Sequence, residues 1–245
     1  DLRSRTNNIS LNQNGEYLQK LQNQNPIDWF IYTSAIKPSQ NLEYQLIAQW
    51  NENNPERQIR LSKRDSLFNF ILKKKQLKLL AVTGTHGKTT TTAMLVWVFK
   101  QLNLPVSYLI GTNVSFGHPA AYAEKSEYFV YECDEFDRNF LEFSPYASLI
   151  ASLDYDHPDT YPNEKDYYTA FETFFNQNEN KVIGWQEDFS KFKSQSRFLS
   201  FDKDRLQEDF QKIHLTGRYN RENAFLAGQL IEYLQLADKD KIYKI

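Results

Sequence analysis

A glycine-containing loop lies between a strand-like and a helix-like segment of the sequence. The apolar residues 77–82 lead into Gly84, Thr85, His86, Gly87, Lys88, Thr89 and Thr90. Two glycines let backbone N–H groups turn toward an anion, and the start of the following helix adds partial positive charge. The lysine can reach phosphate oxygens, and the threonine after it can bind magnesium. The loop predicts a phosphate site in an α/β fold, the alternative being a structural turn with an incidental lysine.

The same alternation of strands and helices runs along most of the chain, which favours a parallel sheet. We expect residues 1–76 to form an incomplete Rossmann-like N-terminal domain. Residues 77–236 should form a central P-loop-type ATPase domain, a parallel sheet flanked by helices, and residues 237–245 the start of a linker. The expected strands are 28–32, 57–61, 77–82, 106–110, 128–132, 147–152 and 181–185, and the expected helices are 16–21, 40–50, 66–74, 88–102, 165–176 and 220–236.

Composition narrows the class of protein. The 245 residues carry a net charge of −2, and this lack of a basic excess argues against nucleic-acid binding. No apolar run approaches the ~20 residues of a membrane-spanning helix. The single cysteine, Cys133, rules out an intrachain disulfide framework and fits a reducing cytoplasm. We interpret Cys133 as a packing residue, because neighbouring carboxylates disfavour a reactive thiolate. Nothing in the sequence indicates the oligomeric state.

An acidic cluster follows the predicted strand at 128–132. Glu132 ends this strand, and Asp134, Glu135 and Asp137 follow it. Ligands of open α/β sheets bind at the carboxyl ends of the strands, and carboxylate oxygens suit magnesium. We therefore predict Glu132 as a magnesium ligand. For the other three acids, metal contact and a solvated loop remain equal alternatives.

A second polar cluster follows the predicted strand at 147–152. It contains Asp156 and His157, followed by Pro158. The imidazole of His157 could bind a second magnesium ion or contact a transferred phosphate, and Asp156 could orient it. The alternative is a turn and capping cluster in front of the proline.

Two asparagines open the last predicted helix. Asn220 and Asn223 follow Gly217, which lies in a turn. Asparagine at a helix start is often only a cap. The functional alternative is that these two amides contact the base or ribose of a nucleotide.

Together these motifs resemble the Mur ligase family. Residues 84–94 are similar to its short phosphate loop, 132–137 to its acidic segment, and 154–161 to its Asp-His motif. Residues 217–223 resemble its nucleotide-contact motif, and 32–36 a segment of its UDP-binding domain. The similarity covers roughly residues 28–236. His86 is typical of the member that adds the first L-alanine to UDP-N-acetylmuramate.

The resemblance implies an ATP- and Mg²⁺-dependent amide ligase of peptidoglycan precursor synthesis, located in the cytoplasm, with UDP-N-acetylmuramate and L-alanine as substrates. The substrate carboxylate would attack the γ-phosphate of ATP, and the amine would then displace phosphate from the acyl phosphate. The implied roles are Lys88 and His157 in catalysis, Gly84 to Thr90 with Asn220 and Asn223 at the nucleotide, Thr89, Glu132 and His157 at metal ions, and Thr33 and Ser34 near the UDP-sugar.

Some features depart from the family pattern. We expect the opening strand with its UDP-binding turn, and the C-terminal amino-acid domain, to lie outside these residues. Tyr219 replaces an expected histidine, Thr33 an expected serine, and Glu172 lies near the place of a carbamylated lysine found in some members. The alternatives left open are a murein tripeptide-recycling ligase, a plain P-loop ATPase or kinase domain, and a binding module without catalysis.

Overall fold

The computed structural model describes Leu18, residues 27–193 and residues 195–245. The chain divides into two compact units, residues 1–68 and 69–245. This division falls inside helix α3 (Arg64–Lys75), whereas the sequence suggested a boundary between residues 76 and 77. Apart from Leu18, which is helical, the expected helix at 16–21 lies outside the described residues.

The smaller unit is built on a parallel pair of strands, β1 and β2, connected through α2. The side chain of Asn41 accepts a hydrogen bond from the backbone N–H of Tyr44 and so caps α2. Leu18, Ile47 and Ile59 form its small core. The elements ahead of α3 are β1 (Trp29–Tyr32), η2 (Pro38–Gln40), α2 (Leu42–Asn53) and β2 (Arg60–Lys63).

The larger unit is a seven-stranded sheet with the order β5-β4-β6-β3-β7-β8-β9. All neighbouring strands pair in parallel except β4 and β5. The predicted fold class, a parallel sheet flanked by helices, is confirmed. The strands are β3 (Lys78–Thr83), β4 (Ser107–Leu109), β5 (Ala120–Ala121), β6 (Tyr128–Glu132), β7 (Ala147–Ile150), β8 (Val182–Trp185) and β9 (Phe198–Phe201).

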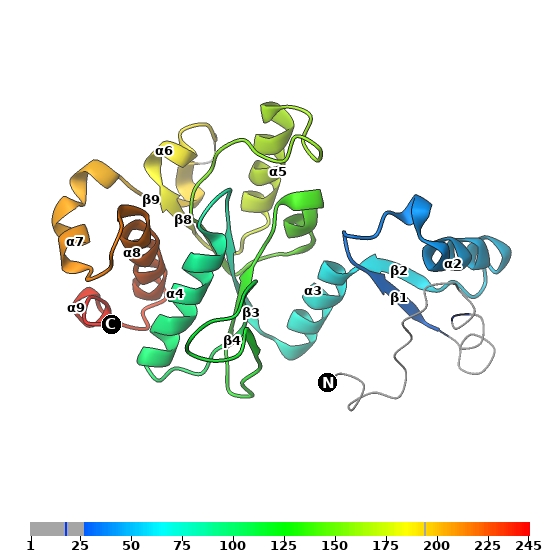
Figure 1. The fold of residues 1–245 in the computed structure, drawn as a ribbon, viewed down its shortest axis with the longest axis horizontal. Coiled ribbons are helices and arrows are strands. Elements are labelled where there is room, and N and C mark those ends of the chain that lie inside the picture. Colours follow the sequence, from blue (N-terminus) through cyan, green and yellow to red (C-terminus); the bar gives the residue numbers. More distant parts are fainter. Residues whose placement is uncertain (1–17, 19–26, 194) are drawn as a thin grey trace. The chain divides into compact units, whose positions relative to one another are not determined.

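Helices cover both faces of this sheet, which is why its central strands are almost continuously apolar (Figure 1). On one face, β-strand side chains such as Val82 and Val130 join an aliphatic core with α4 and α8. On the other, Tyr131 packs against Phe143 and leads into an aromatic layer with α5. The helices are α4 (Lys88–Gln101), η3 (Phe136–Glu142), α5 (Glu164–Asn176), α6 (Gln186–Phe189), η4 (Gln195–Arg197), η5 (Lys203–Arg205), α7 (Gln207–Lys212), α8 (Arg218–Tyr233) and α9 (Lys239–Ile242).

The elements that the sequence did not predict are short. Strand β5 has only two residues, and β9 is a four-residue strand at the other edge of the sheet. Strand β9 is stabilised by tertiary packing, with the rings of Phe189 and Phe198 stacked at 4.1 Å between centroids. The segment that we assigned to the start of a linker contains α9, which contacts α8 where Gly228 leaves room for Ile242.

Candidate functional site

The phosphate loop joins the central strand β3 to α4 and depends on both of its glycines. Gly84 has φ of 121°, and a Cβ atom there would lie 2.3 Å from the carbonyl oxygen of Ser152. Gly87 has φ of 80° and is the N-cap of α4. Both conformations are ones that L-residues rarely adopt. The backbone N–H of Thr85 donates to the carbonyl oxygen of Ser152 at 3.0 Å, so the segment after β7 supports the loop.

Lys88 connects the loop to the acidic cluster. Its Nζ donates to the Gly84 carbonyl oxygen at 2.8 Å and to both carboxylate oxygens of Glu135, at 2.9 and 3.0 Å. The Glu135 side chain is fully buried. Burial raises the pKa of Glu135, and the Lys88 ammonium acts against this by favouring the charged form. The sequence left Glu135 undecided, and the structure places it in direct contact with the predicted catalytic lysine.

The two residues predicted for the first magnesium ion lie together. The hydroxyl of Thr89 donates to Oε1 of Glu132 at 2.9 Å, and the backbone N–H of Gly111 lies 3.3 Å from Oε2. Parallel pairing of β3 with β6 sets Glu132 beside Val82, just ahead of the loop. A hydroxyl and a carboxylate are oxygen ligands of the kind that Mg²⁺ prefers, so the pair fits the implied ion.

His157, in the segment after β7, lies close to the carboxylate of Glu135. Its Nε2 lies 3.4 Å from Oε1 of Glu135 and 3.9 Å from Oδ2 of Asp156. The other Asp156 oxygen accepts the backbone N–H of His157 at 2.7 Å, which stabilises the backbone at φ of 58°. Together with Asp134 and Glu135, His157 offers three ligand atoms within 4.8 Å of one another. The predicted second metal position is thus a compact cluster of suitable ligands.

Asn220 and Asn223 do not cap α8. Gly217 occupies the N-cap position, with φ of 89° and no side-chain cap, so both asparagines lie inside the helix. Asn220 is exposed and donates to the carbonyl oxygen of Thr216 at 2.9 Å. Asn223 is buried, and its amide would lie 3.1 Å from a Cβ atom on Gly87. Asn223 therefore packs against the phosphate loop, whereas Asn220 remains open to solvent.

Two buried tyrosines behind the loop were not predicted. The hydroxyl of Tyr167 lies 3.0 Å from that of Thr85, whose Oγ1 also contacts the backbone of Asp154. The hydroxyl of Tyr161 donates to the carbonyl oxygen of Glu135 at 2.6 Å. Burial raises the pKa of both tyrosines, which keeps them neutral. In the sequence, Tyr167 showed only helical core spacing, which does not distinguish a residue that supports a site.

The remaining predicted residues differ in their exposure. His86 and Thr90 are exposed on the loop and the first turn of α4, and the hydroxyl of Ser152 accepts the backbone N–H of His86 at 3.0 Å. In the smaller unit, Thr33 and Ser34 lie in the turn after β1, where the Thr33 carbonyl oxygen accepts the N–H of Ile36 at 3.0 Å. Their contact with a UDP-sugar stays a prediction.

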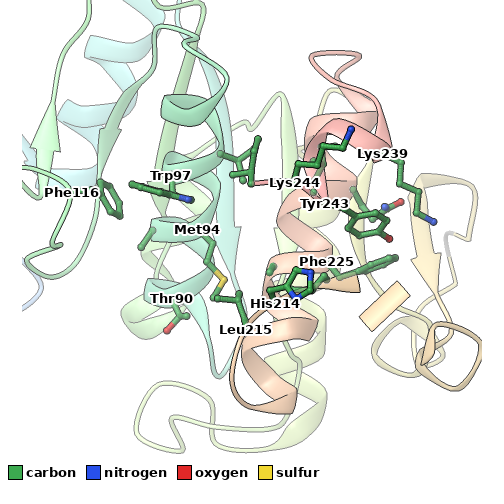
Figure 2. Close-up of a pocket in the computed structure, with 18 of the residues that line it drawn as sticks. Thr90, Met94, Trp97, Phe116, His214, Leu215, Phe225, Lys239, Tyr243 and Lys244 are labelled. Atoms are coloured by element: carbon green, nitrogen blue, oxygen red, sulfur yellow. The ribbon is translucent and has the colours of Figure 1, made fainter. Parts of the chain in front are cut away.

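A cavity of about 580 Å³ opens beside the phosphate loop. It begins at Thr89 and Thr90 and continues between α4 on one side and α8 and α9 on the other (Figure 2). Apolar side chains line most of it, including Met94, Trp97 and Phe225. The site therefore has a charged end at the loop and an apolar end along α4.

Comparison with known proteins identifies the larger unit. Residues 82–188 match the family model of the Mur ligase middle domain. The chain carries a Mur ligase middle domain. It is 34% identical, in an alignment of 189 positions that covers 68% of this chain, to the UDP-N-acetylmuramate–L-alanine ligase of Streptococcus equi subsp. zooepidemicus. It is 39% identical over 109 residues, 44% of its length, to the ligase of that name from Lactobacillus johnsonii. It spans 41% and 24% of these relatives, respectively.

Solved structures agree with this assignment. The UDP-N-acetylmuramate–alanine ligase of Thermotoga maritima matches with a TM-score of 0.65 and 25% identity, covering 89% of this chain and 53% of that one. A UDP-N-acetylmuramate:L-alanyl-gamma-D-glutamyl-meso-diaminopimelate ligase from Neisseria meningitides matches with a TM-score of 0.68 and 18% identity, covering 92% and 79%. The second likeness shows the shared fold.

Within the described residues, no helix is both long and apolar enough to cross a membrane.

Proposed function

We propose that this chain is the nucleotide-binding part of a cytoplasmic, ATP-dependent ligase that joins L-alanine to UDP-N-acetylmuramate in peptidoglycan precursor synthesis. One observation carries the proposal: Lys88, Thr89, Glu132 and His157 come from the ends of three neighbouring strands and gather at one edge of the sheet. They do so in a chain that is 34–39% identical to L-alanine ligases over its matched parts.

The residues present suit ATP and magnesium. Bound magnesium would neutralise phosphate charge, and ATP would supply the phosphoryl group that activates the substrate carboxylate. Thr89 and Glu132 would hold the ion through oxygen atoms. The backbone of the loop and the N-terminus of α4 would bind the phosphates, and the positive φ of Gly87 gives the chain the turn that this requires.

Lys88 has to exchange a partner when phosphate binds. Its ammonium contacts the buried carboxylate of Glu135, which holds it beside the loop. We infer that Glu135 positions Lys88 and that His157 then lies beside the reacting phosphate or a second ion. The substrate carboxylate forms a bond to the γ-phosphorus while the bond to ADP breaks. The amine then displaces inorganic phosphate and loses a proton. Charge neutralisation and alignment supply most of the rate enhancement in such transfers.

The nucleoside would extend from the loop into the adjoining cavity. With the phosphates at Gly87 and Lys88, the ribose and base lie next to Thr90, Leu215 and Ala224, which line the near end of the cavity. Asn223, a residue of α8, packs against the loop at this point and can offer its amide to the nucleotide. In the smaller unit, we propose that Thr33 and Ser34 contact the UDP-sugar.

The test is phosphate release from ATP by the full-length protein with UDP-N-acetylmuramate, in the presence and absence of L-alanine. We expect release to depend strongly on L-alanine and to disappear in Lys88→Ala. Release that needs a preformed tripeptide in place of L-alanine would instead indicate a murein tripeptide-recycling ligase. Release that needs neither would indicate a plain ATPase, and ATP binding without release would indicate a binding module.

A further inference from the structure

The hydroxyl of Thr85, in the phosphate loop, is fully occupied by contacts within the protein. It donates to the carbonyl oxygen of Asp154 at 2.6 Å and accepts the backbone N–H of the same residue at 2.8 Å. A hydroxyl has one proton to donate and two lone pairs that accept. The second lone pair is therefore the one left for Tyr167, whose hydroxyl lies 3.0 Å away.

These contacts determine which of the two hydroxyls is the donor. Because the Thr85 proton is committed to Asp154, the hydrogen bond must run from Tyr167 to Thr85. Tyr167 can donate because burial raises the pKa of its hydroxyl and keeps it protonated. The backbone N–H of Thr85 is also committed, to the carbonyl oxygen of Ser152. Both donors of Thr85 thus hold the loop to the segment after β7.

Tyr167 is itself firmly fixed. It lies in α5 and is fully buried. Its ring makes edge contacts with the rings of Tyr155 and Tyr161, at 5.8 and 5.1 Å between centroids, and packs against Phe171 at 4.9 Å. A ring so closely packed has little freedom to move. Its hydroxyl is therefore a fixed donor against which the loop is placed.

The loop needs such a support because its backbone is costly to order. Gly84 precedes Thr85 and Gly87 follows two residues after it, with φ of 121° and 80°. Glycine loses more conformational freedom on ordering than any other residue. A fixed donor raises the fraction of molecules whose loop is already ordered, and the apparent affinity for a ligand of the loop rises with that fraction.

We propose that Tyr167 is a positioning residue for nucleotide binding, whose buried hydroxyl holds the phosphate loop in its binding conformation through Thr85. The proposal rests on the proposed function, because it takes the phosphates of ATP to bind at this loop. Tyr167→Phe removes only the hydroxyl and should weaken the binding of ATP about fivefold, the effect of one hydrogen bond. Once ATP is bound the loop is ordered in either protein, so the KM for ATP should rise while kcat stays within about twofold.

The experiment measures the Kd of ATP with Mg²⁺ by titration calorimetry, together with KM and kcat, on the full-length protein. Tyr108→Phe is the matched control. Tyr108 is also buried, and its hydroxyl donates to the carbonyl oxygen of His118 at 3.1 Å, outside the phosphate loop. Both variants lose one hydrogen bond of a buried tyrosine, but only Tyr167→Phe should weaken ATP binding.

A second variant tests whether Tyr167 acts through Thr85. Thr85→Val removes the acceptor and should weaken ATP binding at least as much as Tyr167→Phe. Adding Tyr167→Phe to Thr85→Val should then weaken binding no further, because the two residues share one interaction. Losses that add would place the effect of Tyr167 elsewhere and overturn the proposal.

The outcomes separate this proposal from the proposed function. If the wild type does not bind ATP, the proposed function is wrong and the role of Tyr167 falls with it. If the wild type binds ATP and Tyr167→Phe binds it equally well, only the positioning role is wrong. An equal loss in Tyr108→Phe would make the effect one of general stability and would also overturn it. Should Tyr167→Phe fail to fold, Thr85→Val decides alone, and an unchanged Kd refutes the proposal.

Discussion

The two ends of the cavity beside the phosphate loop are built on different principles. At the end near the phosphate loop, two pairs of side chains lie at hydrogen-bonding distance, Lys88 with Glu135 and Thr89 with Glu132. At the far end, apolar side chains line the cavity. A buried charge is costly without a partner, so the phosphate end requires fixed geometry. Apolar groups require only shape and volume, so the far end can tolerate variation. Substitutions should therefore have large effects at the first end and small ones at the second.

The largest effect is expected for Lys88→Ala. The substitution removes the ammonium that would contact phosphate and leaves the buried carboxylate of Glu135 without its partner. Phosphate release should fall about a thousandfold or more, the scale on which charge stabilisation acts in such sites. Steady-state rates on protein with an unchanged circular dichroism spectrum measure this. A rate near that of the wild type would refute the assignment of the loop.

The next effect concerns the metal ion. Glu132→Ala removes the carboxylate that accepts the Thr89 hydroxyl. We expect the Mg²⁺ concentration for half-maximal rate to rise about 10–100-fold, as for other losses of metal-site groups. A magnesium titration of the rate measures it, and Glu124→Ala, an exposed acid outside the site, is the control. An unchanged magnesium requirement would make Glu132 merely a loop acid.

A pair of glycine substitutions tests backbone geometry at the loop and at the start of α8. Gly84 and Gly217 both have positive φ, but only Gly84→Ala places a Cβ atom 2.3 Å from a carbonyl oxygen, whereas at Gly217 the nearest atom is 3.7 Å away. Gly84→Ala should lower the free energy of unfolding by about 3 kcal/mol or more, and Gly217→Ala by about 1 kcal/mol. Urea denaturation measures both. If both variants lost the same free energy of unfolding, the close approach of Gly84 to Ser152 would not matter for stability.

The smallest expected effect is a pH dependence of the folding stability, which comes from Asp188. Asp188 accepts the backbone N–H of Leu153 at 3.3 Å, and among the described residues its Oδ2 has no hydrogen-bond partner. Burial raises the pKa of Asp188 to about 6, although Lys203 acts in the opposite direction. The folded state therefore holds this proton at pH values where the unfolded chain has lost it.

Stability should accordingly fall as the pH rises from about 4 to 6. We expect a contribution of about 1–2 kcal/mol, reduced from the value for full burial because the group is partly exposed. Urea denaturation across this range, compared with Asp188→Asn, measures it. If the wild type and the variant show parallel pH profiles, Asp188 does not carry the effect.

The sequence predicted the fold where its pattern was long and regular. Strand β6 occupies the predicted residues 128–132, and α4 begins at Lys88 as predicted. The same reasoning could not find β5 or β9, because short edge segments show no clear periodicity and depend on tertiary contacts. Their place in the sheet comes from neighbours such as Phe189, which stacks on Phe198.

Local motifs predicted four of the site residues. The structure brings these residues together, and their roles stay predictions; they are Lys88, Thr89, Glu132 and His157. Glu135 was left undecided because burial decides its role, and burial depends on which strands become neighbours. The order of the strands cannot be read from the chain, since β3 lies between β6 and β7, both of which come later in the sequence.

The contact between Asn223 and Gly87 has a consequence for the newly made chain. The loop emerges from the ribosome well before α8, yet the amide of Asn223 packs against it. The central strand β3 must likewise wait for β6 and β7 before it has a neighbour on either side. Contacts between residues so distant in sequence slow folding. During synthesis, therefore, the nascent protein acquires its proposed nucleotide site only after most of the larger unit has been translated.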